Sequence, residues 1–143
     1  MCFSRFLLPG LEFCLKAKSE PVRSEVMAIF VHAIEKGGHF SSLKDMTVLF
    51  ASGDEEANFF HNIFHIQIHR RMRALRCLTD FCDEPEFRNS TLQDIFVPIL
   101  KGSIGGAGTS DHHLVNEAIT TLGRISMHLT WSVITYWSGS IIG

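Results

Sequence analysis

The chain has 143 residues, of which 45% are hydrophobic and 20% charged, values typical of one globular domain rather than of a disordered chain. A formal net charge of −2 excludes any global attraction to nucleic acid or acidic membranes, so a basic surface has to be local. None of the four cysteines forms a C-x-x-C pair, which argues against a zinc ribbon and indicates free thiols in a reducing compartment. We expect no signal peptide in the interrupted apolar start, and no membrane span in the short, partly polar tail at 129–142.

Residues 1–40 predict a first pair of helices. A short helix is expected within 3–17, kinked or started at Pro9, and a second begins at 19–21 and ends at Gly37 and Gly38. The apolar face expected for the second helix holds Val22, Val26, Ile29 and Ala33, with Phe30 at its edge. A helix, a polar turn and a Pro-Val-Arg start resemble the layout of a HEAT repeat, and this resemblance implies that Arg23 braces the turn.

Residues 41–84 predict a central pair. A helix over 43–51, capped by Ser41 or Ser42, is expected to end at Ser52 and Gly53. Residues 54–78 contain no Pro or Gly and predict a helix of about seven turns, with a bend allowed near His65. Its predicted buried stripe consists of Phe60, Phe64, Ile68, Leu75, Leu78 and Cys82.

The same helix carries a local concentration of positive charge, with Arg70, Arg71, Arg73 and Arg76 inside seven residues. Arginines at this density can contact RNA phosphates or an acidic protein. They can also brace the fold, and we favour bracing for Arg71, which projects toward the apolar side. The candidate residues for binding RNA or a partner are therefore His65, His69, Arg70, Arg73 and Arg76, with Arg23 and Arg71 as structural braces.

Residues 85–143 predict a last pair. A helix over 91–101, capped by Asn89 or Ser90, is expected to be kinked at Pro98. Its predicted apolar face consists of Leu92, Ile95, Phe96, Ile99 and Leu100. The glycine-rich residues 102–110 predict a flexible loop, because the Lys-Ser or Lys-Thr of a phosphate-binding loop is absent. Ser110 or Asp111 is expected to cap a final helix that runs to residue 129, with a last short segment from Thr130.

No stretch alternates with a period of two between hairpin turns, so the sequence predicts an all-α fold. Helices in antiparallel pairs with short turns are typical of an α-solenoid of HEAT or armadillo type, with 1–143 as one segment of the array. His61, His65 and His69 lie four residues apart and leave a small metal-binding protein as an alternative, although a third ligand type is missing. We expect no cofactor and no catalytic residues, because no nucleophile and base can be paired from their spacing.

A long run in the centre resembles one family closely. Residues 58–75, NFFHNIFHIQIHRRMRAL, resemble the NFF-x-N-I-x-H-I-Q-x-H-R-R-x-R-A-L signature of the DRIM (down-regulated in metastasis) family, also called the U-three small nucleolar RNA-associated protein twenty family. Residues 95–100 resemble its F-x-x-P-L-L helix, and residues 115–118 and 128–132 resemble its E-A helix and its H-L-S/T-W-S close.

The resemblance implies a non-enzymatic HEAT-repeat scaffold of the small-subunit processome, located in the nucleolus and supporting pre-ribosomal RNA cleavage. The implied partners are processome proteins and pre-ribosomal or small nucleolar RNA, with no membrane and no small-molecule substrate. Family members are many times longer, so we expect the chain to be a fragment. A protein-only helical adaptor remains an alternative, in which the arginines dock an acidic helix.

Overall fold

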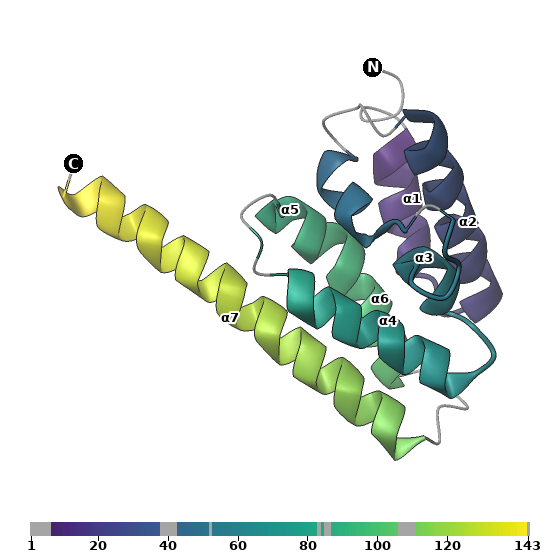
Figure 1. The fold of residues 1–143 in the computed structure, drawn as a ribbon. Coiled ribbons are helices and arrows are strands. Elements are labelled where there is room, and N and C mark those ends of the chain that lie inside the picture. The colour runs from purple at the N-terminus through teal and green to yellow at the C-terminus, as the bar shows by residue number, and fades with distance from the viewer. Residues whose placement is uncertain are drawn as a thin grey trace.

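The computed structural model describes residues 7–37, 43–51, 53–82, 84, 87–105 and 111–142, and within these ranges every regular element is helical. Helices α1 (Leu8–Leu15) and α2 (Glu20–Gly37) form an antiparallel pair (Figure 1). A second layer holds α4 (Ile68–Phe81), α6 (Val97–Gly105) and α7 (His112–Ile142), with α6 running antiparallel to both neighbours (Figure 1). The all-α class is confirmed, and the arrangement is that of an α-solenoid built from antiparallel helix pairs. No helix in the described ranges is long and apolar enough to cross a membrane.

The first helix pair follows the predicted boundaries but buries a different face of α2. Pro9 lies in the first turn of α1 and α2 ends at Gly37, as expected, while Gly38 lies outside the described residues. Val22 and Ile29, predicted to be core residues, are 40% and 48% exposed. The helix is rotated because Arg23 turns inward, and this rotation buries the following set: Val26, Met27, Phe30, Ile34 and Gly37.

The central helix predicted over 54–78 is wrong, because the chain forms two helices there. The Asp54 carboxylate accepts the N–H groups of Glu56 and Ala57, and a four-residue helix, α3 (Phe59–Asn62), follows. The backbone then leaves helical geometry and α4 starts at Ile68, so the bend allowed near His65 is a complete break. As a result Ile68 is 40% exposed and Ile63 is buried, which is the opposite of the prediction for these two residues. The rest of the predicted stripe is confirmed, since Phe60, Leu75, Leu78 and Cys82 are buried and Phe64 packs against the core.

The helix predicted over 43–51 is instead a 3₁₀-helix, η2 (Lys44–Leu49). Its predicted caps, Ser41 and Ser42, and Ser52 of its predicted end lie outside the described residues. Its buried Asp45 accepts hydrogen bonds from the backbone N–H of Arg88 and from the Arg88 guanidinium, both at 3.1 Å. Burial alone would raise the pKa of Asp45, but these bonds outweigh it and hold the pKa below its ordinary value. The pair holds η2 against the start of the next helical run.

That run consists of α5 (Asn89–Thr91), the π-helical turn η3 (Leu92–Phe96) and α6. Its predicted apolar face is confirmed, since all five of its residues are buried. Pro98 is tolerated because η3 widens the backbone immediately before it: the N–H of Val97 bonds to the carbonyl of Leu92, five residues back.

Two predictions at the C-terminal end fail in part. The loop predicted over 102–110 is helical as far as Gly105, with the Ser103 hydroxyl bonded to the Ile99 carbonyl at 3.2 Å, and residues 106–110 lie outside the described ranges. Asp111 caps α7 as predicted, accepting the N–H groups of His113 and Leu114. The helix continues to Ile142, so no separate segment starts at Thr130.

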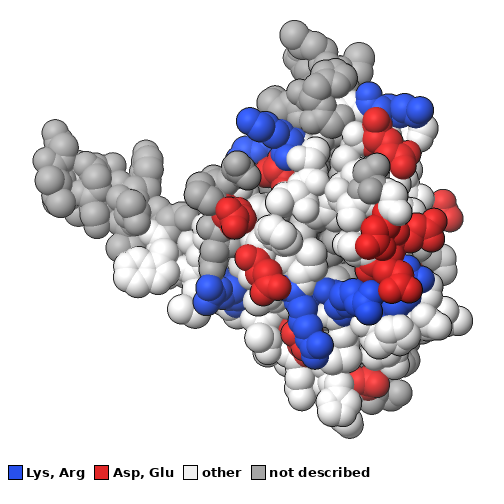
Figure 2. Space-filling model, in the orientation of Figure 1, with Lys and Arg blue, Asp and Glu red and all other residues white. Residues whose placement is uncertain are grey.

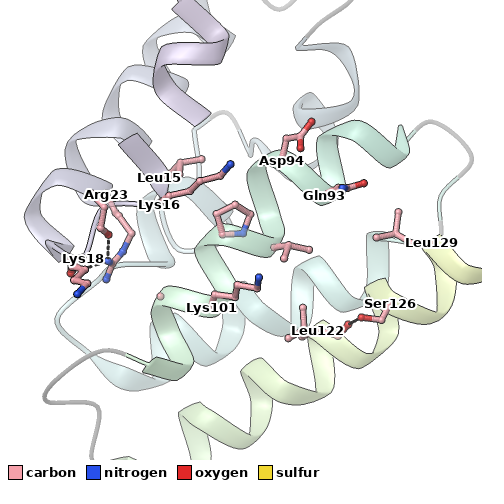
Figure 3. Close-up of a pocket in the computed structure, with 14 residues that line it drawn as sticks. Leu15, Lys16, Lys18, Arg23, Gln93, Asp94, Lys101, Leu122, Ser126 and Leu129 are labelled. Atoms are coloured by element: carbon pink, nitrogen blue, oxygen red, sulfur yellow. Dashed lines mark hydrogen bonds between the residues drawn. The ribbon is translucent and has the colours of Figure 1, made fainter. Parts of the chain in front are cut away.

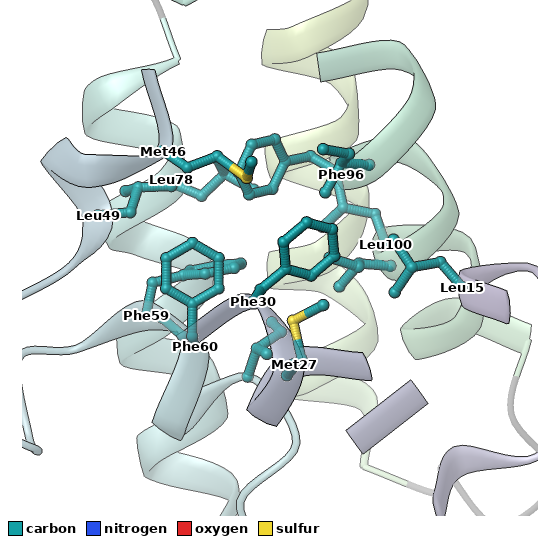
Figure 4. Packing of buried hydrophobic residues seen from close by; sticks show 14 of the residues in the cluster. Leu15, Met27, Phe30, Met46, Leu49, Phe59, Phe60, Leu78, Phe96 and Leu100 are labelled. Atoms are coloured by element: carbon teal, nitrogen blue, oxygen red, sulfur yellow. The ribbon is translucent and has the colours of Figure 1, made fainter. Parts of the chain in front are cut away.

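The core lies where α2, α3, α4 and η3 meet, and aromatic rings fill much of it (Figure 4). Phe59 packs edge-on against Phe60 and Phe96, with centroids 5.3 Å and 5.5 Å apart. Phe96 makes a similar contact with Phe87 at 5.9 Å. Edge-to-face geometry adds about 0.5–1.5 kcal/mol per pair beyond the area that it buries.

Gly102 provides a test of how tightly α6 packs on the first helix pair. A Cβ placed on Gly102 would lie 2.9 Å from Nε of the buried Arg23, whereas one on Gly123 in α7 would meet nothing within 4 Å. We expect Gly102→Ala to lower the free energy of unfolding by about 1–3 kcal/mol through overpacking. Gly123→Ala should raise it by about 0.5–1 kcal/mol, because alanine favours helix. Urea unfolding compares the two, and equal stability of both variants would contradict the close contact.

Candidate functional site at the arginine cluster of α4

The arginine cluster consists of Arg70, Arg71, Arg73 and Arg76, all on α4. His65 lies just before this helix and His69 lies in its first turn. The structure brings Arg70 and Arg71 close to His65, while Arg73 and Arg76 extend along the outer surface. The four arginines therefore divide into two pairs with different surroundings.

Arg70 is held by contacts inside the chain. Its Nε donates to the Asn62 side-chain oxygen at 2.6 Å, and its Nη2 donates to the Glu55 carbonyl at 3.3 Å. Its Nη1 lies 3.0 Å from Nε2 of His65. Arg70 Nε and Nη2 thus have acceptors in Asn62 and Glu55, which fix α4 against the chain segment that precedes it, and Nη1 faces His65.

Asn62 organises that segment, and it was missing from the predicted site. Asn62 is 1% exposed, and its side-chain nitrogen lies 2.9, 2.9 and 2.7 Å from the carbonyl oxygens of Glu55, Glu56 and Asn58. Its two N–H groups therefore serve three acceptors, and one N–H is shared. Asn58 is also buried and caps α3 by accepting the N–H of Phe60 at 3.0 Å. The available signal was two asparagines four residues apart in an apolar run, a pattern that favours local bonds to backbone over a continuous helix. We call Asn62 and its three carbonyl acceptors the asparagine clamp.

The surroundings of His65 disfavour its charged form. Its Nδ1 faces the backbone N–H of Gln67 at 3.1 Å, and its Nε2 faces the Arg70 guanidinium. A neutral imidazole has one acceptor nitrogen, so only one of these two bonds forms at a time. Desolvation, followed by the charges of Arg70, His69 and Arg71, lowers the pKa of His65 below its ordinary value.

Arg71 connects α4 to α2. Its Nη2 lies 2.7 Å from the Glu20 carboxylate, and its Nε donates to the carbonyl of His65. Its side chain is only 18% exposed, so this ion pair is screened less than a surface pair. These contacts support the bracing role predicted for Arg71.

Arg23 braces the first turn of the fold in a similar way. Its Nη1 donates to the carbonyls of Ala17 and Lys18 at 2.6 and 3.0 Å, and its guanidinium lies 5.7 Å from the centre of the Phe64 ring. It is 4% exposed, which makes it a buried cation: its Nη1 is satisfied by backbone oxygens, whereas its Nε has no hydrogen-bond partner among the described residues. The contacts support the brace implied by the HEAT-like start.

Arg73 and Arg76 are the exposed half of the cluster. Arg73 pairs with Glu56 at 3.0 Å and Arg76 with Glu117 at 3.1 Å, and their side chains are 53% and 62% exposed. Exposed pairs of this kind contribute about 0–1 kcal/mol each, so their arginines can exchange partners. Figure 2 shows positive side chains interleaved with negative ones over this face, rather than a uniformly basic surface.

The alternative of a metal site at His61, His65 and His69 required all three on one helix face. The backbone breaks between α3 and α4, so they do not share a helix. His61 and His69 are exposed on different helices, and His65 bonds toward Arg70. Within the ranges that the structure describes, no three His, Cys, Asp or Glu side chains gather where they could hold a metal ion. The described cysteines, Cys14, Cys77 and Cys82, form no disulfide with one another, and burial raises the pKa of Cys77.

Packed antiparallel helices with an internally braced arginine cluster define a helical-repeat protein of solenoid type. No family model matches the chain. U3 small nucleolar RNA-associated protein 20 of Schizosaccharomyces pombe is 35% identical to it over 130 residues, 91% of this chain, and the protein of the same name from Saccharomyces cerevisiae is 28% identical over 126 residues, 88% of it. The chain is a homologue of a stretch of U3 small nucleolar RNA-associated protein 20, which confirms the resemblance to the DRIM family. It spans 5% of the length of either relative.

Proposed function

We propose that the chain is a scaffold segment that supports pre-ribosomal RNA processing and assembly of the small ribosomal subunit, in the nucleolus. The observation that carries this proposal is the alignment of about nine-tenths of the chain with two proteins named for their association with U3 small nucleolar RNA. Helices held together by buried aromatic rings and by the Arg71–Glu20 pair suit a rigid surface for partners. The proposal assigns no catalytic role to any residue.

The proposed contact surface is the set predicted from the sequence: His65, His69, Arg70, Arg73 and Arg76. Within it, Arg73, Arg76 and His69 would meet RNA first, because they are exposed and the two arginines are held only by surface ion pairs. Arg70 and His65 would act behind them, by fixing the start of α4. RNA phosphates would displace Glu56 and Glu117 from these arginines, so binding should weaken steeply with salt.

The test is binding of U3 small nucleolar RNA to the 143-residue chain at several salt concentrations. Replacing Arg73 and Arg76 by glutamine removes both charges without creating repulsion toward their glutamates. We expect the salt slope to fall by about one per lost phosphate contact, and the affinity to fall about tenfold or more at low salt. The double variant should stay folded, since both side chains are more than half exposed.

Lys36→Gln with Lys44→Gln is the matched control, because it removes two exposed charges from α2 and η2 and should leave binding unchanged. Equal RNA binding by the arginine variant and this control would overturn the RNA part of the proposal. An acidic protein is the second candidate partner, because its carboxylates would take the places of Glu56 and Glu117 at the two exposed arginines. Competition between such a partner and RNA for the same arginines separates the two.

A further inference from the structure

A groove separate from the arginine cluster lies where three parts of the chain meet. Its walls are the turn after α1 at residues 15–18, the stretch 93–102 from η3 to α6, and one face of α7 at residues 122–129 (Figure 3). Its volume is about 1000 Å³, at the upper end of the range of about 300–1000 Å³ for pockets that take ligands. It is thus large enough to accept several side chains of a partner.

The walls offer apolar surface from all three parts of the chain. The apolar residues that line the groove are Leu15, Val97, Pro98, Leu122 and Leu129. Leu15 is buried, while Leu122 and Leu129 are only partly buried and pack at the margin of the core. An apolar surface of this kind gains free energy when a ligand's hydrocarbon side chains cover it.

The rim of the groove is positively charged, although the chain as a whole is not. Lys16, Lys18 and Lys101 are exposed and line the groove together, against a single acidic lining residue, Asp94. Asp94 lies at the end away from Lys18 (Figure 3). The groove therefore carries a local excess of positive charge within a chain whose net charge is −2.

Arg23 holds the backbone that carries two of these lysines. Its bonds to the Ala17 and Lys18 carbonyls hold the turn that carries Lys16 and Lys18. Gly102 lets α6 approach the Arg23 guanidinium closely, which places Lys101 across the groove from the turn (Figure 3). Arg23 is a positioning residue here, and a rim built in advance lowers the ordering cost of binding.

We propose that this groove docks an acidic amphipathic segment of a partner protein, with apolar side chains on its floor and carboxylates toward Lys16, Lys18 and Lys101. RNA fits less well. None of the described residues that line the groove is aromatic, so bases have no stacking surface, and Asp94 repels phosphate. The site does not involve Arg73 or Arg76, so it stands or falls separately from RNA binding at the arginine cluster.

The probe is a fluorescent synthetic helix with leucines on one face and glutamates on the other, titrated with the 143-residue chain and followed by anisotropy. A second peptide keeps the leucines and carries lysines in place of the glutamates. We expect the glutamate peptide to bind and the lysine peptide to bind at least about tenfold more weakly. Lys16→Glu with Lys101→Glu should weaken the glutamate peptide by a similar factor, and Lys36→Glu with Lys44→Glu should not.

All four lysines are exposed, so the variants should keep the far-ultraviolet circular dichroism spectrum of the parent chain. Absence of binding by the glutamate peptide, or equal binding by the two double variants, would overturn the proposal. So would loss of peptide binding on replacing Arg73 and Arg76, because the peptide would then occupy the arginine cluster. Displacement of the peptide by polyuridine RNA, with loss of RNA binding in the Lys16 and Lys101 variant, would assign the groove to RNA instead.

Discussion

Phe96→Ala is expected to lower the free energy of unfolding by about 3–5 kcal/mol, a large share of the roughly 5–15 kcal/mol typical of a domain. Phe96 is 0% exposed and contacts Phe59 and Phe87 edge-on. Phe96 lies in η3, the π-helical turn just before Pro98. We expect this backbone to move little, so the cavity left by the ring would not be filled by the surrounding residues. Urea unfolding followed by circular dichroism measures the loss.

Two variants make that result specific. Phe96→Leu keeps much of the apolar volume. We expect it to lower the free energy of unfolding by less than about 1.5 kcal/mol, well below the loss for the alanine variant. Phe13→Ala removes the same ring from a position that is 77% exposed and should change stability by less than about 0.5 kcal/mol. A midpoint for Phe96→Ala equal to that of Phe13→Ala would show that the aromatic contacts do not hold η3 to α3.

The helical faces that the sequence predicts well are those with apolar residues on one side only. The run from Leu92 to Leu100 is found as expected, since all five residues of its predicted face are buried. The face of α2 was misplaced because Arg23, a cation, occupies a core-facing position that hydrophobic patterning assigns to solvent. Val22 and Ile29 are then left exposed by the rotation.

At the arginine cluster, the sequence predicts which residues are present but not which partners they bind. The positions of the arginines are evident in the sequence, but the partners of Arg70 come from residues 55–65, which approach it only because the helix is broken. Propensity favoured a continuous helix, since the stretch lacks Pro and Gly, and side-chain bonds from Asn58 and Asn62 to the backbone overcame it. The groove was not predictable for a related reason, because its walls come from three stretches far apart in the chain.

The break also explains what the family-like run does in this fold. The run from Asn58 to Leu75 contains the cap of α3, the asparagine clamp, and the arginines that fix α4. Much of this run therefore determines the local fold, and of its three arginines Arg73 alone is exposed. The proposed binding surface therefore depends on the break between α3 and α4 and on the contacts that hold it.

Asn62→Ala is expected to lower the free energy of unfolding by about 2–4 kcal/mol. The change removes the Asn62 donor from the carbonyls of Glu55, Glu56 and Asn58, of which Glu55 keeps the 3.3 Å bond from Arg70, and it removes the acceptor of Arg70 Nε. A buried polar group that loses its partner costs about 1–3 kcal/mol, and more where charge is involved. Asn116→Ala, on the exposed side of α7, is the control and should change stability by less than about 0.5 kcal/mol.

Asn62→Asp separates the two halves of the clamp. A carboxylate can still accept from Arg70 but donates nothing to the three carbonyls, so we expect this variant to be at least as unstable as Asn62→Ala. A double-mutant cycle of Asn62→Ala with Arg70→Ala should give a coupling of about 0.5–3 kcal/mol, measured by urea unfolding. If the coupling is near zero, Asn62 does not hold Arg70, and the Arg70 guanidinium is then available to a partner together with Arg73 and Arg76.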